Sequence, residues 1–146
     1  MPPTTSPVVW FVDSSVILRG IVDKSAAVRN WFATSKAAGD LMVGSQMLEL
    51  EVRRVTRNAK IPQRAATDYL RWFALEPLDK WLVSEAIALK PPLGAADSLH
   101  LASAIRIGAN LVTLATHDAQ LANAATSLRI AVHDPVTDDP RRPPVA

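Results

Sequence analysis

The sequence predicts an α/β fold in which helices cover both faces of a central parallel sheet. Short apolar runs rich in β-branched residues alternate along the chain with longer stretches of helical periodicity. The first of these runs is apolar throughout, which is typical of a strand buried on both faces. At 146 residues, 49% of them hydrophobic, the chain is long enough to form one domain with its own core.

The first strand is expected at residues 8–12 (VVWFV), between Pro7 and Asp13. Ser14 and Ser15 would then cap a helix that starts at Val16. The elements predicted after it, up to residue 75, are a helix at 25–38, a strand at 41–43, a helix at 46–58 capped by Ser45, and a helix from Pro62 to about residue 75.

The second half of the chain repeats the alternation of helix and strand. The helix expected at 95–107 is apolar nearly all round, so we expect it inside the fold. Around it, the sequence predicts a helix at 79–89, a strand at 110–114, a short helix at 119–125 and a strand at 129–132. The domain is therefore expected to span residues 8–135, followed by a flexible, proline-rich tail at 136–146.

Composition excludes some kinds of chemistry. The chain has no cysteine, so it can form neither a disulfide nor a thiolate metal site, which suits a reducing cytoplasm. Its first residues carry no basic segment, and the apolar run at 8–12 is too short for a signal or a spanning helix, so we expect a cytoplasmic protein with no membrane contact. A net charge of +2 is only a weak indication of a nucleic-acid partner.

Three aspartates are candidates for a site at the carboxyl ends of the strands, where open parallel sheets bind ligands. Asp13 directly follows the first strand, and Asp118 follows the strand at 110–114. Asp97 lies in the first turn of the apolar helix, on the same side as Leu101. Each of them could equally be a turn or cap residue, because aspartate often opens a turn or caps a helix.

A fourth carboxylate comes from the helix after Ser45, which offers Glu49 and Glu51. Glu49 lies on the polar side with Arg53 at i+4, so a surface ion pair explains it. Glu51 falls in the apolar arc beside Val55, which makes it the better inward-facing candidate. The choice depends on the rotation of the helix and stays open at this point.

Four carboxylates in one cleft would repel one another strongly unless a cation lay between them. Oxygen ligands without cysteine favour a hard ion, so Mg²⁺ is expected, with Mn²⁺ as a possible substitute. Such an ion polarises a phosphodiester and activates water for attack on it.

The sequence resembles the PIN-domain superfamily, and within it the VapC toxins of VapBC systems. The residues that carry this resemblance are 12–15 (VDSS), Glu51 with Arg54, 96–104 (ADSLHLASA) and 116–121 (THDAQL). The similarity runs from about residue 9 to residue 135, and the segment around Asp97 is its most specific part.

The resemblance implies a three-layer α/β/α PIN-like fold, a Mg²⁺ or Mn²⁺ site and endonucleolytic cleavage of RNA, such as transfer or ribosomal RNA. Carried over residue by residue, Asp13, Glu51, Asp97 and Asp118 match the family's acidic quartet, both as catalytic residues and as metal ligands, and Thr116 matches its supporting hydroxyl residue. Ser14 is a candidate for a supporting contact to the site. His117 stands where the family often has another residue, which leaves a site role for it in doubt.

The resemblance also implies a homodimer and a cognate VapB-like antitoxin whose C-terminal segment covers the cleft. Aromatic residues could anchor such interfaces, although on amphipathic helices they more often belong to the core. The candidates are Trp31, Phe32, Trp72, Phe73 and Trp81.

Other polar residues have an ordinary explanation beside a functional one. A basic run that could hold RNA phosphates is also what a solvated helix face looks like; it comprises Arg53, Arg54, Arg57 and Lys60, with Arg64 nearby. His100 and His133 are given no role, because a lone histidine on a buried element is usually a satisfied core residue.

Four other functions are compatible with parts of the pattern. A haloacid-dehalogenase-type phosphatase needs a second aspartate where this chain has Ser15, and a receiver domain needs an acidic pair and a lysine that the sequence lacks. A PIN-type nuclease of RNA processing that is not a toxin stays open. So does a silent PIN-like module that binds RNA or protein, although it would gain nothing from a costly cluster of charges.

Overall fold

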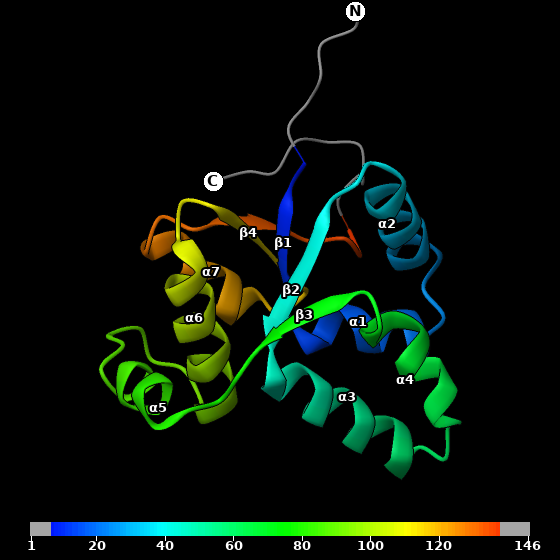
Figure 1. Ribbon diagram of the computed structural model, residues 1–146, viewed down its shortest axis with the longest axis horizontal. Coiled ribbons are helices and arrows are strands. Elements are labelled where there is room, and N and C mark those ends of the chain that lie inside the picture. Colours follow the sequence, from blue (N-terminus) through cyan, green and yellow to red (C-terminus); the bar gives the residue numbers. More distant parts are fainter. Residues whose placement is uncertain (1–6, 138–146) are drawn as a thin grey trace, which may run out of the picture.

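A computed structural model describes residues 7–137 and has an α/β architecture with a five-stranded parallel sheet (Figure 1). The strands are β1 Val9–Val12, β2 Leu41–Ser45, β3 Phe73–Glu76, β4 Val112–Ala115 and β5 Ala131–His133. The helices are α1 Ser14–Ile21, α2 Ala26–Ala37, α3 Gln46–Asn58, α4 Gln63–Leu70, α5 Lys80–Ile87, α6 Ala95–Gly108 and α7 Ala119–Ser127. Among residues 7–137, no helix is both long and apolar enough to span a membrane.

Successive side chains of β1 enter two different cores, which makes the fold three-layered. Trp10 and Val12 pack into the core formed with α1, α2, α3 and α4, whereas Phe11 packs against α6 and α7 on the other face. Phe11 and Val12 are fully buried, as a central strand covered on both sides requires. The predicted α/β/α fold is confirmed.

The sheet order is β3-β2-β1-β4-β5, so the chain builds outward from β1 in one direction and then in the other. The direction reverses between β1 and β4, whose carboxyl ends lie side by side. There the amide of Asp13 donates a hydrogen bond of 2.9 Å to the carbonyl of Ala115. In doubly wound sheets such a reversal opens a crevice at the carboxyl ends of the strands, which places the predicted site between these two.

Two details of the predicted elements are wrong. The predicted helix from Pro62 to about residue 75 is too long: α4 ends at Leu70, and residues 73–76 form the edge strand β3, which pairs with β2. Helix α1 begins at Ser14 with Asp13 in the N-cap position, so Ser14 and Ser15 are not its caps. Ser45 does cap α3, since its hydroxyl accepts from the amide of Met47 at 3.2 Å.

The aromatic candidates divide between core and surface. Trp31 and Phe32 are buried, whereas Trp72 and Trp81 are exposed. Near the end of the described residues, Val136 packs against the core on the α1 side. Most of the predicted flexible tail, residues 138–146, lies outside the described residues.

Candidate metal centre

Asp13 lies at the centre of the site, at the carboxyl end of β1. It is 3% exposed, and its Oδ2 accepts hydrogen bonds from the hydroxyls of Ser15 at 2.7 Å and Thr116 at 2.9 Å. A buried carboxylate needs such partners, because the removal of its charge from water costs on the order of several kcal/mol when no hydrogen bond replaces the water. The two hydroxyls fix one oxygen of Asp13 and leave Oδ1 directed toward α6.

Thr116 links the aspartates that follow the two central strands. Its hydroxyl donates to Asp13 and accepts from the amide of Asp118 at 3.0 Å. Asp118 is the N-cap of α7, where its Oδ1 accepts from the amides of Gln120 and Leu121. The cap role expected as the ordinary explanation for Asp118 is therefore real, and it involves Oδ1 alone.

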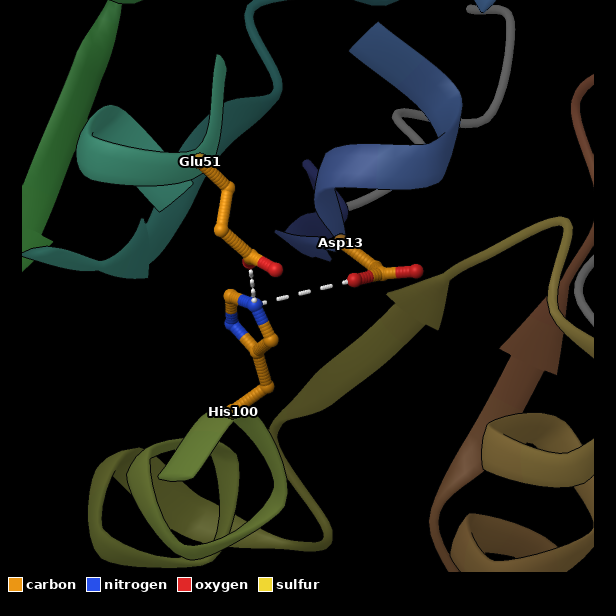
Figure 2. A group of neighbouring side chains, drawn as sticks. All are labelled: Asp13, Glu51 and His100. Atoms are coloured by element: carbon orange, nitrogen blue, oxygen red, sulfur yellow. Dashed lines mark hydrogen bonds and ion pairs between the residues drawn. The ribbon is translucent and has the colours of Figure 1, made fainter. Parts of the chain in front are cut away.

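Glu51 and Glu49 point to different sides of α3. Glu49 accepts from Arg53 at 3.0 Å, as predicted for a surface ion pair. Glu51 turns toward β1 and α6, where its Oε1 lies 2.6 Å from Nε2 of His100 (Figure 2). Of the two glutamates, Glu51 is thus the one that reaches Asp13 and its neighbours. The side chain of Glu51 is 30% exposed and its helix neighbour Val55 is 40% exposed, so Glu51 lies at the margin of the buried face of α3.

His100 is the residue of this cluster that sequence reasoning left without a role. It is fully buried, as expected, but its partners belong to the site: Glu51 at 2.6 Å and Oδ1 of Asp13 at 3.7 Å from Nε2. Its Nδ1 lies 3.1 Å from the hydroxyl of Ser45. One signal was available in the sequence, because His100 follows Asp97 by three residues and therefore lies on the same helix face.

The proton between His100 and Glu51 belongs to the imidazole. Burial raises the pKa of Glu51, but hydrogen bonds from His100 and Ser14, together with the charge of His100, outweigh it and lower that pKa overall. Burial lowers the pKa of His100, yet Glu51, Asp13 and Asp97 raise it overall. An ionised Glu51 can only accept, so Nε2 carries the hydrogen and donates it. Ser14 thus supports Glu51, as the sequence suggested.

The pKa of Asp97 is raised above its ordinary value. Burial raises its pKa, and the charges of Asp13, Asp118 and Glu51 raise it further, against an opposing effect of His100. The pKa of Asp97 is thus sensitive to the charges of the other three predicted acids. The N-cap of α6 is Gly94, which leaves Asp97 in the first turn rather than in the cap.

The residues present fit a divalent cation. A carboxylate oxygen of Asp13 and one of Glu51 lie within 4.8 Å of each other and of a ring nitrogen of His100, and the charges of Asp13, Glu51 and Asp118 all act on Asp97. Because Nε2 donates to Glu51, the imidazole does not offer a free lone pair there. The donors suited to an ion are thus the carboxylate oxygens, which Mg²⁺ and Mn²⁺ prefer.

His117 and His133 lie outside this arrangement. Nδ1 of His117 is 2.9 Å from Oδ2 of Asp134, so its ring contacts the segment after β5. His133 is buried, with its ring 5.3 Å from that of Trp10.

Comparisons with solved structures agree with this fold. The structure of VapBC2 from Rickettsia felis bound to a DNA fragment from their promoter matches with a TM-score of 0.68 and 12% identity, over 87% of this chain and 98% of that one. The structure of FitAB bound to the IR36 DNA fragment matches with a TM-score of 0.63 and 19% identity, over 92% and 100%. FitAcB from Neisseria gonorrhoeae matches with a TM-score of 0.62 and 20% identity, over 89% and 100%.

The amino-acid sequence was also compared with known proteins and families. None of the curated proteins matches the sequence. The family model described as "PIN domain" matches residues 10–126, which is most of the chain and includes every predicted site residue. Together with the fold and the acidic cluster, the match shows that this chain belongs to the PIN-domain family.

Proposed function

We propose that the protein is a Mg²⁺-dependent endoribonuclease, with Mn²⁺ as a possible substitute, and the toxin of a type II toxin–antitoxin pair. The proposal is supported by the approach of Asp13 and Glu51 to each other at the carboxyl end of β1, and by the charges of Asp13, Asp118 and Glu51 acting on Asp97. A fold has no structural need for four carboxylates in one place, since they repel one another. A cation that binds phosphodiesters explains why these acids are gathered there.

Each residue has a role in this proposal. Asp13, Glu51, Asp97 and Asp118 would hold the ion, which when bound polarises the scissile phosphodiester and activates water. Thr116 fixes the spacing of Asp13 and Asp118 through its two hydrogen bonds. His100 and Ser15 act through Glu51 and Asp13, respectively, and need not touch the substrate.

The toxin assignment rests on the resemblance to VapC proteins and on the solved structures of VapBC2 and FitAB, which share the fold. It implies a cytoplasmic protein, a VapB-like antitoxin that covers the cleft, and a homodimer. Expression of the chain alone should stop bacterial growth, and Asp13→Ala or Asp118→Ala should relieve the inhibition. Retained toxicity in both folded variants would contradict the catalytic assignment.

A direct test of the activity uses the purified chain and total RNA. We expect fragments with Mg²⁺ or Mn²⁺, none with EDTA and none with Asp97→Asn. Asp68→Asn makes the same chemical change at an exposed position on α4 and should cleave like the unmodified chain. Binding of RNA without any metal-dependent cleavage would instead support a silent PIN-like module.

A second test separates a toxin from a nuclease of RNA processing. A toxin is expected to have a small antitoxin gene immediately upstream, and co-expression of that gene should restore growth. Growth inhibition without such a gene would favour the processing nuclease.

A further inference from the structure

A groove of about 660 Å³ lies along α3, outside the acidic cluster. Its lining is rich in arginine and amide side chains, which bind phosphate well. The polar residues that line it are Gln46, Glu49, Arg53, Arg54, Arg57 and Gln63.

Arg53 has structural partners within the groove. Its guanidinium donates to Glu49 at 3.0 Å and to Gln63 at 3.2 Å, and it also reaches the hydroxyl of Thr67 on α4. These contacts join α3 to α4 and neutralise Glu49, the one carboxylate among the lining residues. The guanidinium of Arg53 is therefore held in place as part of the groove wall, and its charge is already balanced by Glu49.

Arg54 and Arg57 carry the unbalanced charge of the groove. Both side chains are exposed, and within residues 7–137 no carboxylate is at ion-pair distance from either of them. They follow one another by three residues, so they lie on the same side of α3. Two unpaired guanidiniums in a hollow favour an anionic ligand with repeated charges.

The groove approaches the acidic cluster at one edge, where Arg54 lines it. Arg54 follows Glu51 by three residues, which places the two side chains on adjacent positions of the helix surface, about 60° apart. Of the two unpaired arginines, Arg54 is the one next to Glu51, and Arg57 continues the basic surface one turn further along α3. Those acids repel a polyanion, and a basic surface beside them offsets the repulsion.

On the basis of the proposed function, we propose that this hollow, the α3 groove, binds the phosphate backbone of a single RNA strand beside the scissile bond. Arg54 and Arg57 contact the phosphates, and Arg53 shapes the wall. The partner is identified by the groove's charge and by its position next to the cluster that requires a phosphodiester.

The test measures binding without cleavage. The full chain, in EDTA, is titrated with a short fluorescein-labelled single-stranded RNA at several salt concentrations, and binding is read by fluorescence anisotropy. Arg54→Gln and Arg57→Gln should each weaken binding by about tenfold. Each should also reduce the slope of log affinity against log salt by about 0.7, the value for one lost phosphate contact on a single strand.

The control is Arg29→Gln, which removes the same charge from the exposed surface of α2. It should keep the affinity and salt slope of the unmodified chain, and circular dichroism should show all variants folded. Equal losses in Arg29→Gln, or none in Arg54→Gln and Arg57→Gln, would overturn the proposal.

Two further arms identify the ligand and keep the proposals separate. A DNA strand of the same sequence that bound while the RNA did not would overturn the assignment to RNA, as would arginine-dependent binding of a protein partner alone. Arginine-dependent RNA binding in a chain that cleaves nothing would support the α3 groove while contradicting the proposed activity. RNA cleavage by the unmodified chain together with unchanged RNA binding in Arg54→Gln and Arg57→Gln would support the proposed activity and contradict the α3 groove.

Discussion

Among the individual residues of the site, the carboxylates repel one another and the hydroxyls and His100 hold them in place. Asp13 is fixed by Ser15 and Thr116, and Glu51 is fixed by His100. The pKa of Asp97 is raised by burial and by its acidic neighbours. These different environments lead to two predictions.

The first prediction concerns His100 as a positioning residue for Glu51. His100→Phe removes the donor to Glu51, so we expect the affinity for Mn²⁺ to fall about 10–100-fold, as is typical when the hydrogen-bond partner of a ligand is lost. His100→Gln keeps an N–H group near the position of Nε2 and should restore much of that affinity. Isothermal titration calorimetry with Mn²⁺ measures both.

The thermal midpoint of each His100 variant separates positioning from packing. If Phe and Gln lowered the Tm equally and bound Mn²⁺ equally well, His100 would be a core residue and nothing more.

The second prediction concerns the stability of the metal-free protein. Asp97→Asn removes a charge that burial and three acids disfavour, so the Tm in EDTA should rise at neutral pH. Because the folded-state pKa of Asp97 lies above its unfolded value, its ionisation costs stability above that pKa and costs nothing once both states are protonated. The gain should therefore shrink as the pH falls through the raised pKa.

Thermal denaturation in EDTA from neutral to acidic pH measures the effect. Asp68→Asn, at an exposed site, should leave the Tm nearly unchanged throughout. A lower Tm for Asp97→Asn at neutral pH would mean that its carboxylate stabilises the metal-free fold, contrary to the expected repulsion among the acids.

Helices and strands were predicted most reliably where burial is two-sided. Strand β1 follows from a uniformly apolar run, α6 from a helical stretch that is apolar nearly all round, and α3 from its Ser45 cap. Edge strand β3 was missed because its residues continue an apolar pattern that a helix could also use, and only pairing with β2 distinguishes the two. An edge strand pairs on one side only, so its local sequence carries less information.

The residues of the site also differ in how far the local sequence could predict them. Asp13 and Asp118 were found because they follow strands, and Glu51 was chosen over Glu49 by helix geometry and the ion pair with Arg53. The spacing of His100 from Asp97 indicated only a shared helix face, and its partners could not be predicted, because Ser45 and Glu51 lie about fifty residues away in the chain. Such a contact exists only once α3 and α6 have packed together.

The third prediction concerns the start of α5. Asp79 caps this helix by accepting from the amide of Leu82 at 2.8 Å, and it also accepts from Arg106 on α6 at 3.0 Å. Asp79→Ser keeps a capping oxygen and loses the ion pair, whereas Asp79→Ala loses both. The Tm should therefore fall in the order unmodified, Ser, Ala, with the larger step between Ser and Ala, because exposed ion pairs contribute little.

Differential scanning calorimetry at low and high salt distinguishes the two contributions. Salt should lower the Tm of the unmodified chain toward that of Asp79→Ser and leave the difference between the Ser and Ala variants in place. If Ser and Ala were equally unstable, the cap would contribute nothing.

For the whole molecule, the fourth prediction links metal binding to folding. The four acids converge only in the folded chain, so an ion bound there stabilises that state by mass action. At a concentration of about 100 times its Kd, Mn²⁺ should add about 2.7 kcal/mol to the free energy of unfolding. Urea denaturation with Mn²⁺ and with EDTA measures the difference, and Asp13→Asn should abolish most of it. An unchanged midpoint for the unmodified chain at saturating Mn²⁺ would contradict a metal site.

The hydrogen bond between Thr116 and Asp13 joins residues 103 positions apart, from opposite ends of the domain. Translation delivers Asp13 about a hundred residues before Thr116 and Asp118, so a polypeptide that is still being made lacks these two residues of the site. If the proposed ribonuclease activity is correct, this order of synthesis delays it until β4 and the start of α7 have been made. Prematurely terminated products that end before β4 should be harmless to the cell that makes them.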